Sequence, residues 1–241
     1  MLHDLDFNTI VFDTRMDAAL KLLEILPTAL MQRDDWLIVA ISGDGVPIAN
    51  AIATKLGLYY DLLFTEAVYA PNNKECQIAM VSETEEIVIH NELVDSFGIN
   101  LDFIYGEAHR KYEEKILKYV YKYRKGDLIG SLKNKNVLLV DEGCETGLTV
   151  LTAIKTAINA EAKSVAYATP IIPTDVAIGL ETVTDEIFSV YRVANFVNVD
   201  FYYRSIQPME PDGIKMIIEN SPNYLPLQKT GELKVCNIPL K

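Results

Sequence analysis

The sequence is poor in cysteine and has no long hydrophobic run, and both shortages exclude classes of protein. Its 241 residues include only three cysteines, far apart and in no CxxC pattern, which argues against a disulfide framework and a structural zinc site. No run approaches the roughly 18 apolar residues of a membrane-spanning helix, so we expect no membrane partner. The N-terminus, MLHDLDFNTI, is acidic and lacks the basic and apolar regions of a signal peptide. We therefore expect a cytoplasmic protein.

Basic residues are also scarce. The chain has 22 Lys and Arg against 34 Asp and Glu, which gives a formal net charge of −12 at pH 7. This imbalance argues against nucleic acid and anionic membranes as partners. An anionic ligand would have to be held by a local arrangement of donors, because the overall field repels it.

What the sequence does contain is an alternation of short apolar runs and helical patterns. The expected strands cover residues 36–41, 58–64, 136–141, 163–171 and 186–193, and the expected helices cover residues 14–31, 48–57, 101–125 and 146–159. Such alternation predicts βαβ units, and so an α/β fold with a mostly parallel central sheet and helices on both faces. Ligands in such sheets bind beyond the carboxyl ends of the strands.

Three other segments have weaker patterns. Residues 65–76 read as irregular, and short strand-like pieces follow at 77–82 and 86–90. Pro27 is expected to kink or end the first helix. The tail from residue 220 is expected to pack as an extended arm.

Two acids end one of the expected strands. Asp141 and Glu142 directly follow the apolar run VLLV, and adjacent carboxylates repel each other, so something has to compensate them. Two carboxylates can accept hydrogen bonds from vicinal hydroxyl groups, and a divalent cation or a nearby Lys or Arg can offset their repulsion. The pair therefore suits a polyhydroxylated ligand.

The turn after the acid pair suits an anion. In ETGLT (145–149) the chain enters a helix, whose free N–H groups and dipole attract negative charge. Thr146 and Thr149 add hydroxyl donors, and Gly147 lets the backbone approach a ligand. The alternative is that Thr146 merely caps the helix. Because the diol-binding pair lies a few residues earlier, the favoured ligand is a 5-phosphorylated ribose.

A second loop, SGDGVP (42–47), lies at the carboxyl end of another expected strand. Its glycines can expose several N–H groups and seat a second anion. Asp44 has the wrong sign for a phosphate contact and would instead hold a cation or cap the following helix. Both loops are expected to face one crevice.

The stretch VLLVDEGCETGLT (137–149) resembles the phosphoribosyl-diphosphate signature of type I phosphoribosyltransferases, in which an apolar strand leads into two acids and a phosphate loop. The resemblance extends over residues 36–218. Within the family, the chain is most similar to a subgroup of predicted phosphoribosyltransferases whose substrate is undefined. It implies a single phosphoribosyltransferase-like domain over residues 1–241, with a small hood and a long helical insertion. The helix at 14–31 and the arm at 220–241 would be appendages to the core.

The resemblance also implies an activity. This is the transfer of a ribosyl 5-phosphate group from phosphoribosyl diphosphate to a nitrogenous base, with release of pyrophosphate. Mg²⁺ would be the cofactor and a homodimer the usual assembly. The alternative is a non-catalytic protein that binds phosphoribosyl diphosphate or a nucleotide and regulates a partner. A degenerate protein that kept only the fold is disfavoured by the intact acid pair and phosphate loop.

The resemblance assigns residues to each part of the ligand. The ribose hydroxyls would be bound by Asp141 and Glu142, directly or through Mg²⁺. The 5-phosphate would be held by Glu145, Thr146, Gly147, Leu148 and Thr149, and the pyrophosphate by Ser42, Gly43 and Asp44, where the family allows a non-proline cis peptide. The remaining roles fall on Tyr202 and Tyr203 at the base side, Glu145 as the base near the nucleophile, and Arg110 and Lys111 as catalytic cations of a mobile loop at 107–126.

Two features weigh against parts of this assignment. Thr65 and Glu66 stand where related proteins often carry a basic pair, which weakens the case for pyrophosphate binding and so for catalysis. Arg110 and Lys111 lie in a charged helical stretch that also reads as a solvated face with ion pairs between successive turns. The tyrosines of the same stretch, Tyr112, Tyr119, Tyr121 and Tyr123, favour helix packing over base stacking.

Overall fold

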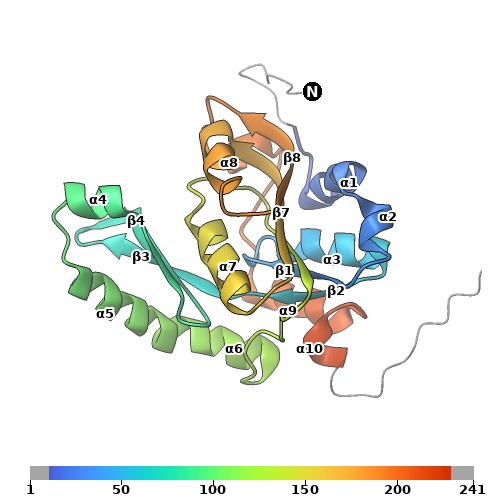
Figure 1. Cartoon of the computed structure of the whole chain (residues 1–241), viewed down its shortest axis with the longest axis horizontal. Helices are drawn as coiled ribbons and strands as arrows, with labels where there is room; N and C mark the ends of the chain where they lie inside the picture. Colours follow the sequence, from blue (N-terminus) through green and yellow to red (C-terminus); the bar gives the residue numbers. More distant parts are fainter. Residues whose placement is uncertain (1–10, 229–241) are drawn as a thin grey trace, which may run out of the picture.

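The computed structural model describes residues 11–228 and has a five-stranded sheet at its centre (Figure 1). The strands run in the order β2–β1–β6–β7–β8, with bounds β1 (Trp36–Ala40), β2 (Tyr59–Leu62), β6 (Asn136–Val140), β7 (Ser164–Pro173) and β8 (Glu186–Val193). All neighbouring pairs in this sheet are parallel. The predicted α/β fold with a mostly parallel central sheet is confirmed.

Helices cover both faces of the sheet, because successive strand residues point to opposite sides. The covering helices are α1 (Arg15–Ile25), α3 (Val46–Leu56), α7 (Leu148–Asn159) and α8 (Thr174–Leu180). In β1, Ile38 and Ala40 join the core that contains α1 and α3, whereas Leu37 and Val39 join the core that contains α7 and α8. Figure 1 shows the two helix pairs on opposite sides of the strands. A continuous apolar run is therefore what this strand needs.

The predicted N-terminal helix is divided at Pro27, as expected. The Thr14 side chain accepts a hydrogen bond from the N–H of Asp17 and begins α1, which ends at Ile25. A second short helix, α2 (Thr28–Met31), follows Pro27. Proline cannot donate to the preceding turn, so the chain changes direction there.

The stretch 65–76, expected to be irregular, forms most of a β-hairpin instead. Its strands belong to a separate antiparallel sheet in the order β3–β4–β5, with bounds β3 (Thr65–Ala70), β4 (Asn73–Ser82) and β5 (Ile87–Ile89). Asn72 sits in the hairpin turn at φ 64°, a conformation that asparagine tolerates better than most residues. The prediction failed because the strand depends on pairing with β4, which local propensity does not report.

The long helical insertion is confirmed and runs along this hairpin. It begins with α4 (Asn91–Ser96), continues as α5 (Leu101–Lys111), passes through a π-helical turn at Tyr112–Ile116 and ends with α6 (Leu117–Arg124). From α5 to α6, four buried apolar side chains recur every four or eight residues and form one stripe, namely Ile104, Ala108, Ile116 and Val120. Figure 1 shows β3, β4, α4 and α5 extending away from the central sheet as an arm.

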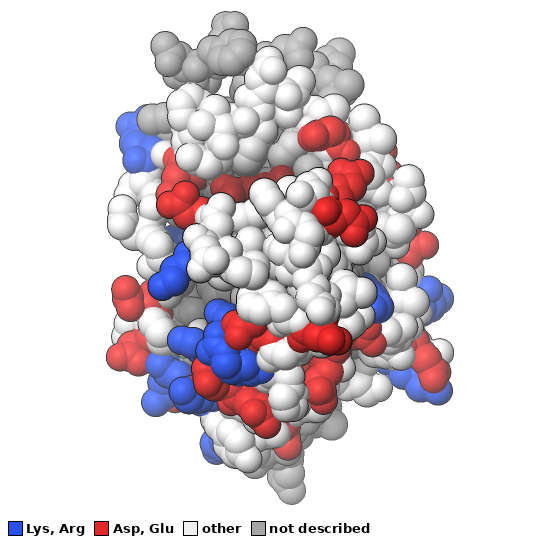
Figure 2. Space-filling view, turned by 90° about the vertical axis from the view of Figure 1, so that its left-hand side faces the viewer, with Lys and Arg blue, Asp and Glu red and all other residues white. Residues whose placement is uncertain are grey.

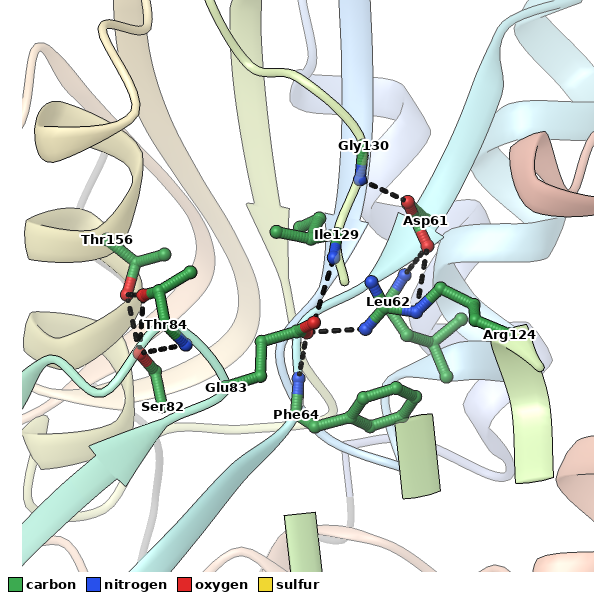
Figure 3. Close-up of polar contacts among 10 residues, drawn as sticks. All are labelled: Asp61, Leu62, Phe64, Ser82, Glu83, Thr84, Arg124, Ile129, Gly130 and Thr156. Atoms are coloured by element: carbon green, nitrogen blue, oxygen red, sulfur yellow. Dashed lines mark hydrogen bonds and ion pairs between the residues drawn. The ribbon is translucent and has the colours of Figure 1, made fainter. Parts of the chain in front are cut away.

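A buried ionic network anchors the end of this insertion to the central sheet (Figure 3). The Arg124 side chain is 1% exposed and pairs with Glu83 at 2.5 Å and with Asp61 at 4.0 Å. Backbone N–H groups satisfy the remaining carboxylate oxygens: Ile129 donates to Glu83 at 2.8 Å and Gly130 to Asp61 at 3.2 Å. Burial raises the pKa of Asp61 to about 6, although the charge of Arg124 lowers it. The network joins β2, the loop after β4, the end of α6 and the loop after it.

Before the predicted arm, the chain forms a 3-10 turn at Asp200–Tyr202 and then α9 (Pro211–Asn220). The arm predicted from residue 220 is extended only in part, because Leu225–Gln228 form the short helix α10. The part of the arm beyond residue 228, with Cys236, lies outside the described residues, as do His3 and the rest of residues 1–10. Within residues 11–228, no helix combines the length and apolarity needed to cross a bilayer.

Candidate functional site

The site lies where the strand order reverses. From β1 the chain crosses to β2 on one side, and from β6 it crosses to β7 on the other, and such switch points leave a crevice at the carboxyl ends of the strands. The loops that leave β1 and β6 touch there, with the N–H of Ile41 donating to Val140 O at 3.0 Å. A Cβ on Gly45 would lie 2.8 Å from the Asp141 Cα, so only glycine permits this approach. A cavity of about 280 Å³ opens beside these loops.

The acid pair lines this cavity. Asp141 is 4% exposed, and its Oδ2 accepts a hydrogen bond from the Tyr167 hydroxyl at 2.5 Å, whereas its Oδ1 is buried without a hydrogen-bond partner among the described residues. Burial and then the Glu142 charge raise the pKa of Asp141 well above its usual range. Burial also raises the pKa of Glu142 to about 7. The Ser42 hydroxyl donates a hydrogen bond to Glu142 at 2.5 Å, which lowers this pKa but does not offset the effect of burial. A cation or a hydroxylated ligand would relieve this repulsion.

Arg15 is a site residue that sequence analysis missed. It lines the crevice from the start of α1, and its guanidinium pairs with Asp44 and donates to Gln207 O at 2.8 Å. Asp44 also accepts from the N–H of Met209 at 2.7 Å. Arg15 lowers the pKa of Glu142, so it supplies part of the compensation that the acid pair needs. Nothing in the spacing of the sequence connects position 15 with the two loops.

Gln77 is a second missed residue. It reaches the crevice from β4 of the hairpin. Its amide Nε2 is buried and has no hydrogen-bond partner among the described residues, which is costly unless a ligand or water accepts from it. The stretch around it read only as a short strand, so no signal marked the residue.

The phosphate turn has the geometry of an open helix start. Gly147 is the N-cap residue of α7 at φ 79°, and no side chain caps the helix. The interpretation of Thr146 as a helix cap is therefore wrong. Thr146 and Thr149 both line the crevice, so two hydroxyl groups and the first N–H groups of α7 adjoin the acid pair. This combination can hold an anion.

The remaining residues of the two loops mainly make contacts within the protein. Glu145 also lines the crevice, and its carboxylate accepts from the N–H of Val199 at 3.0 Å, which connects the turn to the C-terminal segment. Leu148 is buried beneath the turn. Burial raises the pKa of the Cys144 thiol far above its usual range, which agrees with its interpretation as non-nucleophilic. The described residues contain no cis peptide, so the cis bond expected near Ser42 is not found.

Tyr202 and Tyr203, expected on the base side, are both buried. The Tyr203 hydroxyl donates to the backbone carbonyl of Glu142 at 2.7 Å, and the Tyr202 hydroxyl accepts from the N–H of Val197 at 3.3 Å. The wall of the crevice on this side is instead formed by four neighbours, Val199, Asp200, Ile206 and Pro208. The tyrosines therefore position this wall, and their contact with a base stays a prediction.

Arg110 and Lys111 point to different surroundings. Arg110 pairs with Glu107 at 2.7 Å and Glu114 at 2.6 Å on the exposed face of α5. On the face drawn in Figure 2, which carries α4 and α5, basic and acidic side chains are intermixed. Lys111 pairs with Glu66 at 3.5 Å. The structure therefore does not bring Arg110 to the crevice. Lys111 places a positive charge next to Glu66, which stands where related proteins often carry a basic residue.

An acid pair and an uncapped helix start thus share one crevice at the edge of a parallel sheet, as the resemblance predicted. The phosphoribosyl transferase domain model matches residues 16–205, and the chain therefore belongs to this family. A Mycobacterium tuberculosis protein named "Putative phosphoribosyl transferase" is 25% identical over 212 residues, which are 88% of this chain and 47% of that protein. The chain thus spans about half the length of the curated relatives it matches.

A solved structure shares the fold. The protein TT1426 from Thermus thermophilus has a TM-score of 0.68 and 23% identity, covering 86% of this chain and 97% of that one. A purine phosphoribosyltransferase from Pyrococcus horikoshii has a TM-score of 0.44 and 17% identity, covering 83% and 97%. The match to the family model confirms the resemblance to phosphoribosyltransferases stated from the sequence.

Proposed function

We propose that the protein binds phosphoribosyl diphosphate and transfers its ribosyl 5-phosphate group to a nitrogenous base, releasing pyrophosphate. One observation carries the proposal. A single cavity is lined both by an under-compensated acid pair, the buried Asp141 and the part-buried Glu142, and by the uncapped start of α7. The acid pair suits a ribose diol and the helix start suits a 5-phosphate. The two lie only a few residues apart in the chain, so local geometry keeps them close together.

In this reaction the bond between the ribose C1 and the pyrophosphate oxygen breaks, and a bond from C1 to a base nitrogen forms. Positive charge grows on the sugar and negative charge on the leaving group, so the protein acts mainly by placing charges and donors. Ser42, Gly43 and Asp44 would contact the pyrophosphate, with Arg15 as a cation beside them. Glu145 is the proposed base for the nucleophile.

Magnesium fits the residues present. No group of three or more His, Cys, Asp or Glu side chains within residues 11–228 is arranged to hold a metal ion. Mg²⁺, however, commonly takes one or two carboxylates together with phosphate oxygens and water. Asp141, whose Oδ1 is unpartnered, and Glu142 provide such a pair. When bound, Mg²⁺ would neutralise charge on the pyrophosphate oxygens.

A non-catalytic binding protein is the second candidate. Glu66 and the loop residues Ser42 and Gly43 line the same cavity, and the ammonium of Lys111 is paired with Glu66 at 3.5 Å. Ligand binding without turnover would follow if Arg15 and Lys111 both stay paired with Asp44 and Glu66 and neither stabilises the leaving group. A homodimer, the usual arrangement in the family, is also part of the proposal.

Calorimetry and an assay of pyrophosphate release separate these outcomes. Phosphoribosyl diphosphate should bind in the presence of Mg²⁺, and the double variant Asp141→Asn, Glu142→Gln should weaken binding by about 1–3 kcal/mol per charge-assisted hydrogen bond lost. Asp35→Asn, a side chain 72% exposed, serves as the control. Unchanged affinity in the double variant would refute the site. Binding without pyrophosphate release in a screen of purine and pyrimidine bases would favour the non-catalytic protein.

A further inference from the structure

Gln77 is a polar side chain of the crevice to which the proposed function assigns no role. It lies in β4 of the hairpin and lines the crevice together with the acid pair and the start of α7. Its amide Nε2 is buried and has no hydrogen-bond partner among the described residues. A buried donor without an acceptor destabilises the folded state. The fold alone therefore gives no reason for an amide at this position.

An irregularity in the hairpin directs Gln77 toward the crevice. Val68 of β3 pairs with Ala79 of β4, whereas the next residue, Tyr69, pairs with Gln77. Ile78 is therefore an extra residue in β4, as in a β-bulge. In a regular strand Gln77 would point to the same side as Ala79, because side chains alternate with a period of two. A bulge changes this direction, and bulges are common next to binding and active sites.

The strand brings Gln77 to the start of α7. At the end of β4, the Thr156 hydroxyl of α7 donates to the Ser82 hydroxyl at 3.0 Å, so the strand and the helix lie side by side. From this contact, about 17 Å of strand lead back to Gln77, and about 10 Å of helix lead back to Thr149 in the first turn. Gln77 and Thr149 both line the crevice. The amide therefore enters the crevice on the side of the uncapped N–H groups of α7.

The crevice has few cations with which to hold an anion. Of the described residues that line it, five are carboxylates and one, Arg15, is a cation. The guanidinium of Arg15 is paired with Asp44. A phosphate group at the start of α7 must therefore be held mainly by neutral donors, such as backbone N–H groups, hydroxyls and amides. Among the described lining residues, Gln77 has the only side-chain amide.

We propose that Gln77 is a specificity-determining residue, whose side-chain amide donates a hydrogen bond to the phosphate group held at the start of α7. This inference rests on the proposed function and adds to it a donor from the hairpin, far in sequence from the binding loop. A sugar without the phosphate leaves the buried amide unsatisfied. Through Gln77 the crevice therefore selects phosphorylated sugars over unphosphorylated ones.

The variant Gln77→Met tests this role, because methionine is similar in length to glutamine and lacks the N–H donor. It should bind ribose 5-phosphate about tenfold more weakly than wild type, the loss expected for a hydrogen bond to a charged group, and should bind ribose as wild type does. Without ligand its melting temperature should equal or exceed that of wild type, since an unsatisfied buried donor has been removed. Gln77→Glu should weaken ribose 5-phosphate further, because a carboxylate then faces the phosphate.

Calorimetry measures the affinity for ribose 5-phosphate, and ligand-observed NMR measures the weaker binding of ribose. Gln32→Met is the matched control. The Gln32 amide lies outside the crevice and donates to Leu56 O at 3.3 Å, so this variant should bind ribose 5-phosphate as wild type does and should gain no stability.

Three results would overturn the inference and leave the proposed function standing. Gln77→Met could bind ribose 5-phosphate as tightly as wild type, could weaken ribose and ribose 5-phosphate by the same factor, or could be less stable than wild type without ligand. The last result would show that the amide is satisfied within the protein. Failure of the proposed function gives a different result, because wild type itself would then not bind ribose 5-phosphate, which overturns both.

Discussion

At the scale of single residues, the main feature of the site is a pair of carboxylates whose charged forms are destabilised by their surroundings in the fold. Asp141 is buried and Glu142 beside it is partly buried, and the loss of solvent raises the pKa of both carboxyl groups. A structural role would be served better by neutral side chains, because burying a charge without full compensation costs stability. The unfavourable pair is therefore evidence for function. Arg15 is the cation that the fold places beside it.

We expect Glu142→Gln to stabilise the protein without ligand, and only above mildly acidic pH. The Glu142 pKa rises from 4.5 to about 7 on folding, so the folded state holds more protons in this window and the free energy of unfolding falls as pH increases through it. The variant should be more stable than wild type by about 1–3 kcal/mol above pH 7, with the difference vanishing toward about pH 4.5.

Urea unfolding in the presence of EDTA at several pH values measures this difference. Glu219→Gln, on the exposed face of α9, should show no comparable pH dependence. A Glu142→Gln variant less stable than wild type at pH 8 would mean that the carboxylate is fully compensated in the folded state.

Arg15→Met should weaken phosphoribosyl diphosphate about tenfold, because a hydrogen bond to a charged group contributes roughly 1.5–3 kcal/mol. Arg15→Lys should restore part of the affinity, since charge is kept and the fork geometry is lost. Arg33→Met, an exposed side chain, is the control. Calorimetry decides the point. If Arg15→Met binds as wild type does, Arg15 serves only to hold Asp44 and the segment near Gln207.

At the scale of elements, the helical insertion combines a solvated surface with a buried root. Along α5 the charges are exposed and pair between successive turns, as the solvated-face interpretation expected. At the end of α6, Arg124 is fully enclosed between Asp61 and Glu83. The ion pairs of Arg110 are therefore expected to contribute little to the free energy of unfolding, and those of Arg124 much more, because only Arg124 is buried.

Arg124→Met should destabilise the protein by about 3–5 kcal/mol, because it leaves two buried carboxylates without their cation. Arg110→Met, in the same insertion, should leave the free energy of unfolding nearly unchanged, since its partners Glu107 and Glu114 remain in water. Denaturant unfolding of both variants at neutral pH compares them directly. Equal effects would contradict the division of the insertion into a surface and a buried anchor.

At the scale of the whole molecule, the net negative charge of the protein repels the anionic ligand that we propose. The chain has a net charge of −12, yet the proposed ligand is an anion. Long-range attraction therefore cannot guide the ligand to the crevice. The local donors, namely the start of α7, Arg15 and the loop after β1, have to overcome the field once contact is made.

We expect the association rate of phosphoribosyl diphosphate to increase with ionic strength. Raising salt from about 0.01 M to 0.15 M shortens the Debye length from about 30 Å to about 8 Å and screens the repulsion. Stopped-flow binding at several KCl concentrations measures the rate, with ribose as the uncharged control. A rate that falls as salt increases would show that a local positive field, and not the net charge, controls the approach.

The sequence by itself determined the parallel sheet and the main binding loop of this protein. Continuous apolar runs such as residues 36–40 are required where both faces of a strand are buried, so this pattern predicts its own environment. The acid pair and the turn at 145–149 are contiguous, so their relative placement follows from local geometry. These inferences needed only short-range rules, and the structure placed each feature at the expected strand end.

Only the tertiary structure decided which distant residues complete the site. Arg15 and Gln77 reach the crevice from a terminal helix and a hairpin, and that hairpin exists only because β3 pairs with β4. Tyr203 turned out to support the acid pair from behind, through the backbone of Glu142, and Lys111 proved to neutralise Glu66. All these contacts join residues far apart in the chain. Their formation depends on how elements pack, a quantity that no local pattern of side chains encodes.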